Sequence, residues 1–190
     1  MKKILQDLTF SQIEELTLAL GEKKFRAKQL FEGLTQGKTI DGITPLSKDF
    51  KEKLKAEFEN EPIKIRERYL SSDGTEKYLF EYADGNLVEG VLMKYKYGYT
   101  LCVSTQVGCR MGCAFCATGI DGLARNLRPS EMLGQIYQIQ KISGERVSNV
   151  VVMGTGEPMD NYDNFVKFVR MLSKYFYITK LIITLTIDFI

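Results

Sequence analysis

The four cysteines of this chain all lie in one stretch, LCVSTQVGCRMGCAFCATG, which begins at Leu101. Cys109, Cys113 and Cys116 have the spacing C-x3-C-x2-C, and Cys102 precedes them on the same stretch. Cysteine thiolates are the ligands of iron–sulfur clusters and of structural zinc, so this spacing indicates a metal centre. A cubane cluster normally takes four such ligands, and three neighbouring cysteines leave one iron open to a small molecule.

A zinc site built from all four cysteines is the main alternative. Structural zinc usually binds two short-spaced pairs that a longer stretch separates, and here only Cys113 and Cys116 form such a pair. The sequence contains no histidine that could complete a site of three cysteines and one histidine. A disulfide framework is disfavoured because no secretory signal accompanies the cysteines. The spacing therefore favours a cluster over zinc.

The composition is that of an ordinary globular protein, with 44% hydrophobic residues, 26% charged residues and a net charge of +2. No stretch has the length of a signal-peptide core at the N-terminus or of a membrane span elsewhere, so we expect a cytoplasmic protein without membrane contacts. Three basic stretches, EKKFRAK from Glu22, KDFKEKLK from Lys48 and KIRER from Lys64, are typical of solvent-exposed helix faces. A phosphate-binding surface is the less favoured interpretation.

Residues 1–60 predict three amphipathic helices. Thr9 and Gln12 have the spacing of a capping box, which marks the start of the first helix. Three apolar stripes at helical spacing then follow: Ile13, Leu16 and Leu20; Ala27, Leu30, Phe31 and Leu34; Leu46, Phe50, Leu54 and Phe58. We expect these helices to form a compact accessory domain over residues 1–60.

Strand signals replace the helical pattern after Pro62. Alternating aromatic residues, a turn at Asp84-Gly85 and an apolar run that ends at Met93 predict a β-hairpin. We assign this hairpin to a linker region over residues 61–98. A further strand, residues 99–104, runs directly into the cysteine loop.

Beyond the cysteine loop, strands and helices alternate. Ser130 is expected to cap a helix, VSNVVVM from Val147 is a buried strand, residues 165–172 mark a second helix, and KLIITLTI from Lys180 is a third strand. This order predicts a parallel sheet with crossover helices, whose site loops gather at the carboxyl ends of the strands. The fold class is therefore α/β, with an incomplete core domain over residues 99–190.

The loop GTGEP, which begins at Gly154, follows the second of these strands. It fails the dinucleotide-binding fingerprint because Met159 stands where the third glycine is required. On its own the loop is equally consistent with a plain strand-to-helix turn.

Together these motifs resemble a known family. C-x3-C-x2-C with Phe115 before the last cysteine is similar to the radical S-adenosylmethionine (SAM) superfamily. The longer run CVSTQVGCRMGCAFCATG, followed by GLARNL, resembles the RlmN/Cfr group of RNA adenine methyltransferases. VVMGTGEPMDNYDNF is similar to the Gly-Glu-Pro segment of that group, and FRAKQLFEGL and LSKDFKEKL resemble its N-terminal accessory domain. The resemblance extends to about residue 178 and implies the first half of a partial (β/α)6 barrel.

The resemblance implies cofactor ligands at the matching positions. Cys109, Cys113 and Cys116 would hold a [4Fe-4S] cluster, whose open iron takes the amino and carboxylate groups of SAM. Gly156 and Glu157 would bind SAM as well.

The resemblance also implies two catalytic residues. Cys102 would deprotonate the methylated adenine adduct and form a disulfide with a methyl-carrying cysteine near the C-terminus; taken alone, it would be interpreted as a small buried strand residue. Glu89 would handle a proton at the substrate base; taken alone, it would be a solvent-facing carboxylate.

The resemblance weakens close to Ile190. Thr186 aligns with a SAM-contacting serine, whereas Asp188 and Phe189 stand where the family has Cys or Ser and then Gly. Apart from the three cysteines of the cluster motif, no second cysteine is present that Cys102 could pair with. We therefore expect an N-terminal fragment that does not complete methyl transfer alone.

The sequence thus predicts an RlmN-type enzyme whose intact form methylates C2 of adenosine 2503 in 23S rRNA and of adenosine 37 in tRNA. We expect a monomer that takes electrons from a donor such as flavodoxin, with the lysines of the accessory helices on RNA phosphates. Three alternatives stay open: a Cfr-like enzyme that methylates C8, a non-enzymatic zinc module that binds RNA, and the insoluble product of a broken gene.

Overall fold

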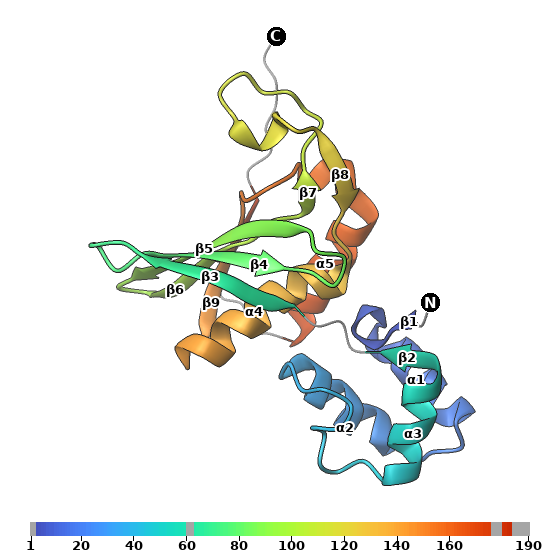
Figure 1. Cartoon of the computed structure of the whole chain (residues 1–190). Helices are drawn as coiled ribbons and strands as arrows, with labels where there is room; N and C mark the ends of the chain where they lie inside the picture. The colour runs from blue at the N-terminus through green and yellow to red at the C-terminus, as the bar shows by residue number, and fades with distance from the viewer. Residues whose placement is uncertain (1–2, 60–62, 176–179, 184–190) are drawn as a thin grey trace. The chain divides into compact units, whose positions relative to one another are not determined.

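The computed structural model of the chain describes residues 3–59, 63–175 and 180–183. The chain divides into two compact units, residues 1–61 and residues 62–190 (Figure 1). No helix among the described residues is long and apolar enough to cross a bilayer.

The first unit contains the three predicted helices, α1 (Phe10–Ala19), α2 (Lys24–Thr35) and α3 (Lys48–Glu57). The predicted capping box is confirmed, because the Thr9 side chain accepts from the Gln12 backbone and the Gln12 side chain accepts from the Thr9 backbone. A 3-10 turn and two short parallel strands accompany the helices: η1 (Leu5–Asp7), β1 (Lys3–Ile4) and β2 (Phe58–Glu59). The apolar faces of the helices form the core of this unit, with Ile13, Leu30 and Phe50 fully buried.

The second unit is built on a six-stranded sheet with the order β10-β9-β6-β5-β4-β3. Its strands are β3 (Lys64–Leu70), β4 (Glu76–Glu81), β5 (Leu87–Tyr95), β6 (Gly98–Cys102), β9 (Val147–Val152) and β10 (Lys180–Ile183). Strands β6, β9 and β10 pair in parallel, whereas β3, β4, β5 and β6 pair in antiparallel fashion. The predicted hairpin is confirmed as β4 and β5, and its strands belong to the same sheet as the parallel strands.

The KIRER stretch does not lie on a helix. It forms most of β3, the edge strand of the sheet, where every described side chain except that of Ile65 is exposed. The helical interpretation of this stretch was therefore wrong. The charges do face solvent, as expected, but they do so on an edge strand, where charged side chains discourage pairing with other chains.

Two helices connect the parallel strands in the predicted order, α4 (Pro129–Ser143) between β6 and β9 and α5 (Tyr162–Tyr175) between β9 and β10. The predicted cap at Ser130 is wrong, since Arg128 is the N-cap and Pro129 is the first helical residue. The fixed φ of Pro129 suits that position, and the Glu131 carboxylate accepts from the Arg128 amide at 2.7 Å. Ser130 lies buried in the first turn.

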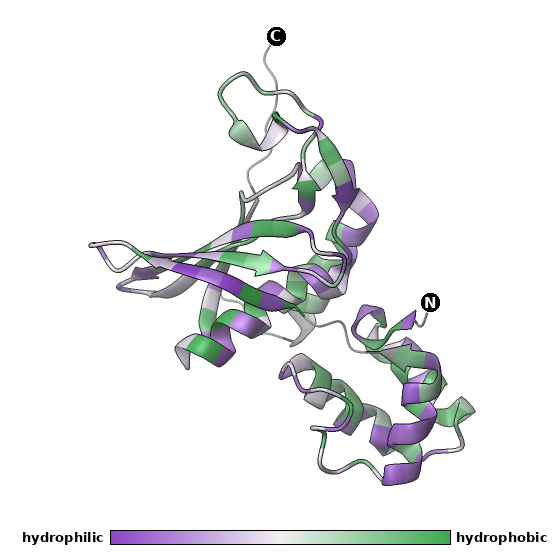
Figure 2. Ribbon diagram, in the orientation of Figure 1, coloured by the Kyte–Doolittle hydropathy of each residue, from purple (hydrophilic) through white to green (hydrophobic). Residues whose placement is uncertain are grey.

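Both helices pack on one face of the sheet. Met132 and Ile136 of α4 and Phe168 of α5 form one core cluster with Leu101 of β6 and Val150 of β9. Figure 2 shows that α4 and α5 each carry hydrophobic and hydrophilic faces. The opposite face of the sheet, which we term the open face, is not covered by these helices.

Substitution of Ile136 by alanine should destabilise the second unit by roughly 3 kcal/mol, because the side chain is fully buried between α4 and the sheet. Ile142→Ala, a change of the same residue type on the same helix, is the matched control, since Ile142 is 48% exposed. Its effect should stay within about 0.5 kcal/mol. Urea unfolding followed by circular dichroism measures both changes, and equal effects would contradict the packing described here.

Candidate functional site

The cysteine loop leaves the sheet just beyond Cys102, the last residue of β6. It is carried by a small antiparallel pair, β7 (Gln106–Gly108) and β8 (Leu123–Asn126). The loop projects from this pair (Figure 1, yellow), and the Cys109 amide closes its base by donating to the Gly122 carbonyl at 3.0 Å. Gly108 is required there, because a Cβ at this position would clash with the same carbonyl.

The thiols of the loop face solvent to different degrees. Cys109 and Cys113 are half-buried and Cys116 is exposed, and none of the three is in a disulfide. Hydrogen bonds from the Thr118 hydroxyl and backbone lower the pKa of Cys116, which favours the thiolate that a metal requires. Much of the loop is also hydrophobic (Figure 2), and its Phe115 side chain is 87% exposed.

The three thiols are of the chemical type that binds an iron–sulfur cluster, since all three are reduced and lie on one solvent-facing loop. The loop conformation does not bring them to ligand distances, because among the described residues no group of three Cys, Asp or Glu side chains is close enough to hold a metal ion. The ligand assignment of Cys109, Cys113 and Cys116 therefore stays a prediction.

The two site loops, one after β6 and one after β9, are hydrogen-bonded to each other. The ladder continues past the strands, with the Val103 amide donating to the Val151 carbonyl at 2.9 Å and the Gly154 amide to the Val103 carbonyl at 3.1 Å. The Thr105 amide then donates to the Thr155 carbonyl at 2.8 Å. These bonds hold the start of the cysteine segment against the Gly-Glu-Pro loop.

The glycines of the Gly-Glu-Pro loop permit this close approach. A Cβ on Gly154 would lie 2.7 Å from the Val103 carbonyl oxygen, and one on Gly156 would lie 2.5 Å from Cβ of Gln106. Gly156 also has φ +100°, a conformation that other residues rarely adopt. The contact of Gly156 with SAM stays a prediction. The close approach to Gln106 and the positive φ are sufficient by themselves to require glycine at this position.

Glu157, the other predicted SAM ligand, is buried, with 6% of its surface exposed. Its amide donates to Oε1 of Gln106 at 2.8 Å, and its carboxylate accepts from the Met159 amide at 3.0 Å, which caps the 3-10 helix η3 (Pro158–Asn161). The residue before Gln106 is Thr105, whose hydroxyl is buried without a hydrogen-bond partner in the described part of the chain. A buried carboxylate and an unpartnered hydroxyl on the joined loops fit a polar cofactor.

Sequence reasoning missed the amide side chains that support the two loops. Gln135 of α4 accepts from the Ser104 amide at 2.9 Å and donates to the Ser104 carbonyl at 3.0 Å, so it pairs with both backbone groups as a neighbouring strand would. Asn161 donates to the carbonyls of Thr105 and Leu127 at 2.9 Å and 2.8 Å. Gln135 and Asn161 are both buried. In the sequence, the only indication of this supporting role was the position of Gln135, a polar residue directly beside the apolar stripe of its helix.

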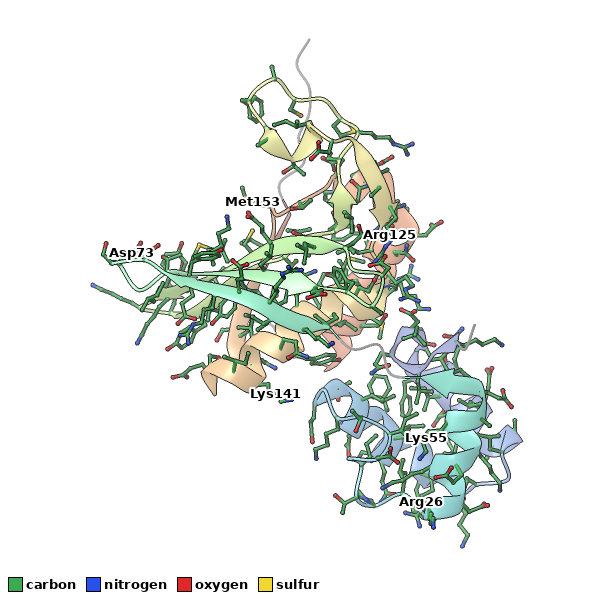
Figure 3. All side chains as sticks on the ribbon, in the orientation of Figure 1. Arg26, Lys55, Asp73, Arg125, Lys141 and Met153 are labelled. Carbon is green, nitrogen blue, oxygen red and sulfur yellow. The ribbon has the colours of Figure 1, made fainter. Side chains whose placement is uncertain are left out.

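Ion pairs of Arg110 and of Arg125 fasten the cysteine loop and the strands that carry it. Arg110, next to Cys109, donates to both carboxylate oxygens of Asp160 at 3.0 Å and 2.9 Å and thereby lowers the pKa of Asp160. Arg125 of β8, labelled in Figure 3, makes a bidentate pair with the fully buried Glu131 at 2.9 Å and 2.8 Å. The first pair joins the loop to η3, and the second joins β8 to α4.

Cys102 and Glu89 lie on the same face of the sheet. Cys102 pairs with Val91 of β5, and Glu89 is two residues from Val91, so the alternation of side chains places all three on the open face. Glu89 is exposed and forms an ion pair with Lys77 of β4. The structure thus brings the two predicted catalytic residues to one surface.

Burial raises the pKa of the Cys102 thiol, and a hydrogen bond with the Met153 backbone offsets part of this effect. Met153 follows β9 directly and is exposed (Figure 3). Near neutral pH the thiol is therefore protonated.

The remaining predicted site residue, Thr186, lies outside the described residues, as do Asp188 and Phe189.

Comparison with known families and proteins gives consistent matches. The profile of the Radical SAM superfamily matches residues 103–188, and that of the ribosomal RNA large subunit methyltransferase N-terminal domain matches residues 4–59. A protein of Lachnoclostridium phytofermentans named "Probable dual-specificity RNA methyltransferase RlmN" is 55% identical over 172 residues, which cover 89% of this chain and 48% of that protein. A protein of the same name from Lachnospira eligens is 53% identical over 174 residues, with 89% and 49% covered.

A fold similar to that of this chain is found among solved structures. The crystal structure of a radical SAM methyltransferase from Sphaerobacter thermophilus superposes with a TM-score of 0.84 at 35% identity, over 95% of this chain and 56% of that one. The chain spans about half the length of the curated relatives it matches.

The two kinds of cysteine should differ in reactivity. Because the pKa of Cys116 is lowered and that of Cys102 is raised, iodoacetamide should modify exposed Cys116 at least about tenfold faster than Cys102 near neutral pH. Raising the pH should accelerate Cys102 more, since less of it starts as thiolate. Timed alkylation of the metal-free chain with peptide mass spectrometry measures both rates. In urea the rates should converge, and equal rates in the folded chain would contradict the environments described.

Proposed function

The chain belongs to the radical SAM superfamily, in its RlmN/Cfr group, and on that premise we propose that it provides the cluster-binding and cofactor-binding part of an RNA adenine methyltransferase of the RlmN type. The observation that carries the proposal is the joining of the cysteine loop and the Gly-Glu-Pro loop at the carboxyl ends of β6 and β9. Open α/β sheets bind their ligands at this end.

Cys109, Cys113 and Cys116 would hold a [4Fe-4S] cluster, and Gly156 and Glu157 would bind SAM. When bound, the cluster and SAM supply the one-electron reductive cleavage on which radical SAM chemistry depends. The hydrogen bonds between the two loops support the proposal because they would hold the base of the cluster loop and the SAM-binding loop together. Thr186 would add a hydroxyl contact to SAM.

Cys102 and Glu89 would act on the substrate base. Both lie on the open face, so an adenine placed there could meet both side chains. The half-buried Cys102 thiol carries a proton near neutral pH, so it would have to release that proton to solvent before it could take one from the adduct, and its hydrogen bond with the Met153 backbone favours the thiolate so formed. Glu89, held by Lys77, would take or return a proton at the base.

The substrate would be an adenosine of 23S rRNA, and of tRNA, methylated at C2. The lysines of the N-terminal helical unit would contact RNA phosphates, because such contacts provide much of the affinity for RNA. We further propose a cytoplasmic monomer that takes electrons from a small donor protein such as flavodoxin.

Replacement of Cys113 by alanine should abolish cluster assembly, because only two neighbouring thiols then remain on the loop. Cys102→Ala is the matched control: it removes the same side chain outside the proposed ligand set and should leave iron content unchanged. Anaerobic reconstitution followed by iron, sulfide and zinc analysis and a visible spectrum measures this. Colourless protein with one zinc per chain would contradict the proposal.

Methyl transfer is tested with the reconstituted, reduced chain, SAM and 23S rRNA or tRNA, followed by nucleoside analysis. Formation of 2-methyladenosine would support the proposal, and 8-methyladenosine would place the chain with the Cfr-like enzymes. Deoxyadenosine without methylated RNA is the result we expect of this chain by itself, because no cysteine outside the stretch from Cys102 to Cys116 is present to carry the methyl group.

A further inference from the structure

The turn between β5 and β6 presents two exposed tyrosines. Tyr95 and Tyr97 are 43% and 70% exposed, and their rings stack with centroids 5.0 Å apart and an interplanar angle of 8°. The Tyr95 hydroxyl also contacts the sulfur of Met93 at 3.4 Å, so the inner ring rests against its own strand. Flat aromatic surface left in water by a folded protein often marks a binding site.

Lysines alternate with these tyrosines in the run KYKYGY, which begins at Lys94. Lys94 and Lys96 are both exposed, and among the residues that the structure describes no carboxylate forms an ion pair with either. Lys94, adjacent to Tyr95 on β5, lies on the face that packs against the helices, where its ammonium is 5.7 Å from the ring centroid of Tyr99, so Lys96 is the lysine beside the tyrosine pair. No acidic residue occurs anywhere between Gly90 and Ile120. The turn therefore carries positive charge without a negative partner in its own segment.

The carboxylate of the β3–β4 turn, Asp73, is not in an ion pair with these lysines among the described residues. The β3–β4 turn lies at the same end (Figure 3, Asp73), and its carboxylate accepts from the Thr75 amide at 2.9 Å and from the Thr75 hydroxyl at 3.1 Å. Asp73 is thus engaged within its own turn.

The turn is connected to the proposed catalytic surface by one strand. Tyr95 lies four residues from Val91 on β5, and Val91 pairs with Cys102, so Tyr95, Val91 and Cys102 share the open face. At about 3.3 Å per residue, Tyr95 is roughly 13 Å from the level of Cys102. A strand of RNA with one base near Cys102 could reach the tyrosines with a nearby nucleotide.

We propose that the Tyr95–Tyr97 turn is an RNA-binding platform that stacks an unpaired base on the Tyr95–Tyr97 pair while Lys96 contacts a flanking phosphate. Single-stranded RNA is the occupant that matches both features, because its bases stack on aromatic rings and its phosphates attract lysine. A fully paired duplex offers phosphates to a lysine but no unpaired base that could stack on the tyrosines. This inference rests on the proposed function, since it assigns a contact to the RNA that the enzyme would methylate.

The test is fluorescence anisotropy with the complete chain and two RNAs of equal length, one unpaired and one fully duplex. Tyr97→Ala should weaken binding of the unpaired RNA about tenfold, with little effect on the duplex. Tyr97→Phe keeps the ring and should bind as the unchanged chain does. Tyr162→Ala, on α5, removes a tyrosine that is 57% exposed and belongs to a helix packed on the opposite face of the sheet, and should have no effect.

A change of Lys96 to glutamine should lower binding of both RNAs and reduce the slope of log affinity against log salt by roughly one. Circular dichroism of each variant establishes that it is folded, which is expected because Tyr97 and Lys96 are exposed.

The inference is overturned if the unchanged chain does not bind the unpaired RNA, or if Tyr97→Ala binds it equally well, as a protein-docking turn would. The experiment needs neither cluster nor SAM, so it separates this inference from the proposed function. Loss of the cluster or of methylation would refute the enzyme proposal and leave the RNA-binding result intact.

Discussion

The structure around the site depends on one interaction, the continuation of the β6–β9 ladder into the loops beyond both strands. The hydrogen bonds of Val103 with Val151 and Gly154, and of Thr105 with Thr155, run past the last strand residues. They require that Gly154 and Gly156 lack side chains, because a Cβ at either position would overlap the other segment. Through this ladder the cysteine segment and the Gly-Glu-Pro loop form one surface rather than two independent loops.

Buried amides make this surface rigid. A loop that leaves a sheet exposes backbone N–H and C=O groups, and burying them without partners costs free energy. Gln135 satisfies both backbone groups of Ser104, Asn161 satisfies the carbonyl of Thr105, and Gln106 binds the amide of Glu157. The helices thus contribute to the site through polar side chains as well as through apolar packing. The ion pair of Arg110 with Asp160 extends the same support to the first residues of the cysteine loop.

Residues that are distant in the sequence lie together on the open face of the sheet. Helices α4 and α5 cover one face, and strand alternation places Cys102 and Glu89 on the other. The tyrosine turn lies at the far end of the same strand pair. An antiparallel extension joined to a parallel sheet can therefore present a thiol, a carboxylate and an aromatic platform along one surface.

Local patterns in the sequence determined much of this protein: the helices from apolar periodicity, the hairpin from alternation around Asp84-Gly85, and the cysteine loop from its spacing. These features depend on neighbouring residues, so they can be read without the fold. The cap at Arg128 is local as well, since Pro129 and Glu131 set it, although the pattern pointed to Ser130. The edge strand that contains KIRER and the loop-supporting role of Gln135 were decided by tertiary structure. Both depend on partners distant in the chain, such as Ser104 for Gln135, whose proximity only the completed sheet and its helices create.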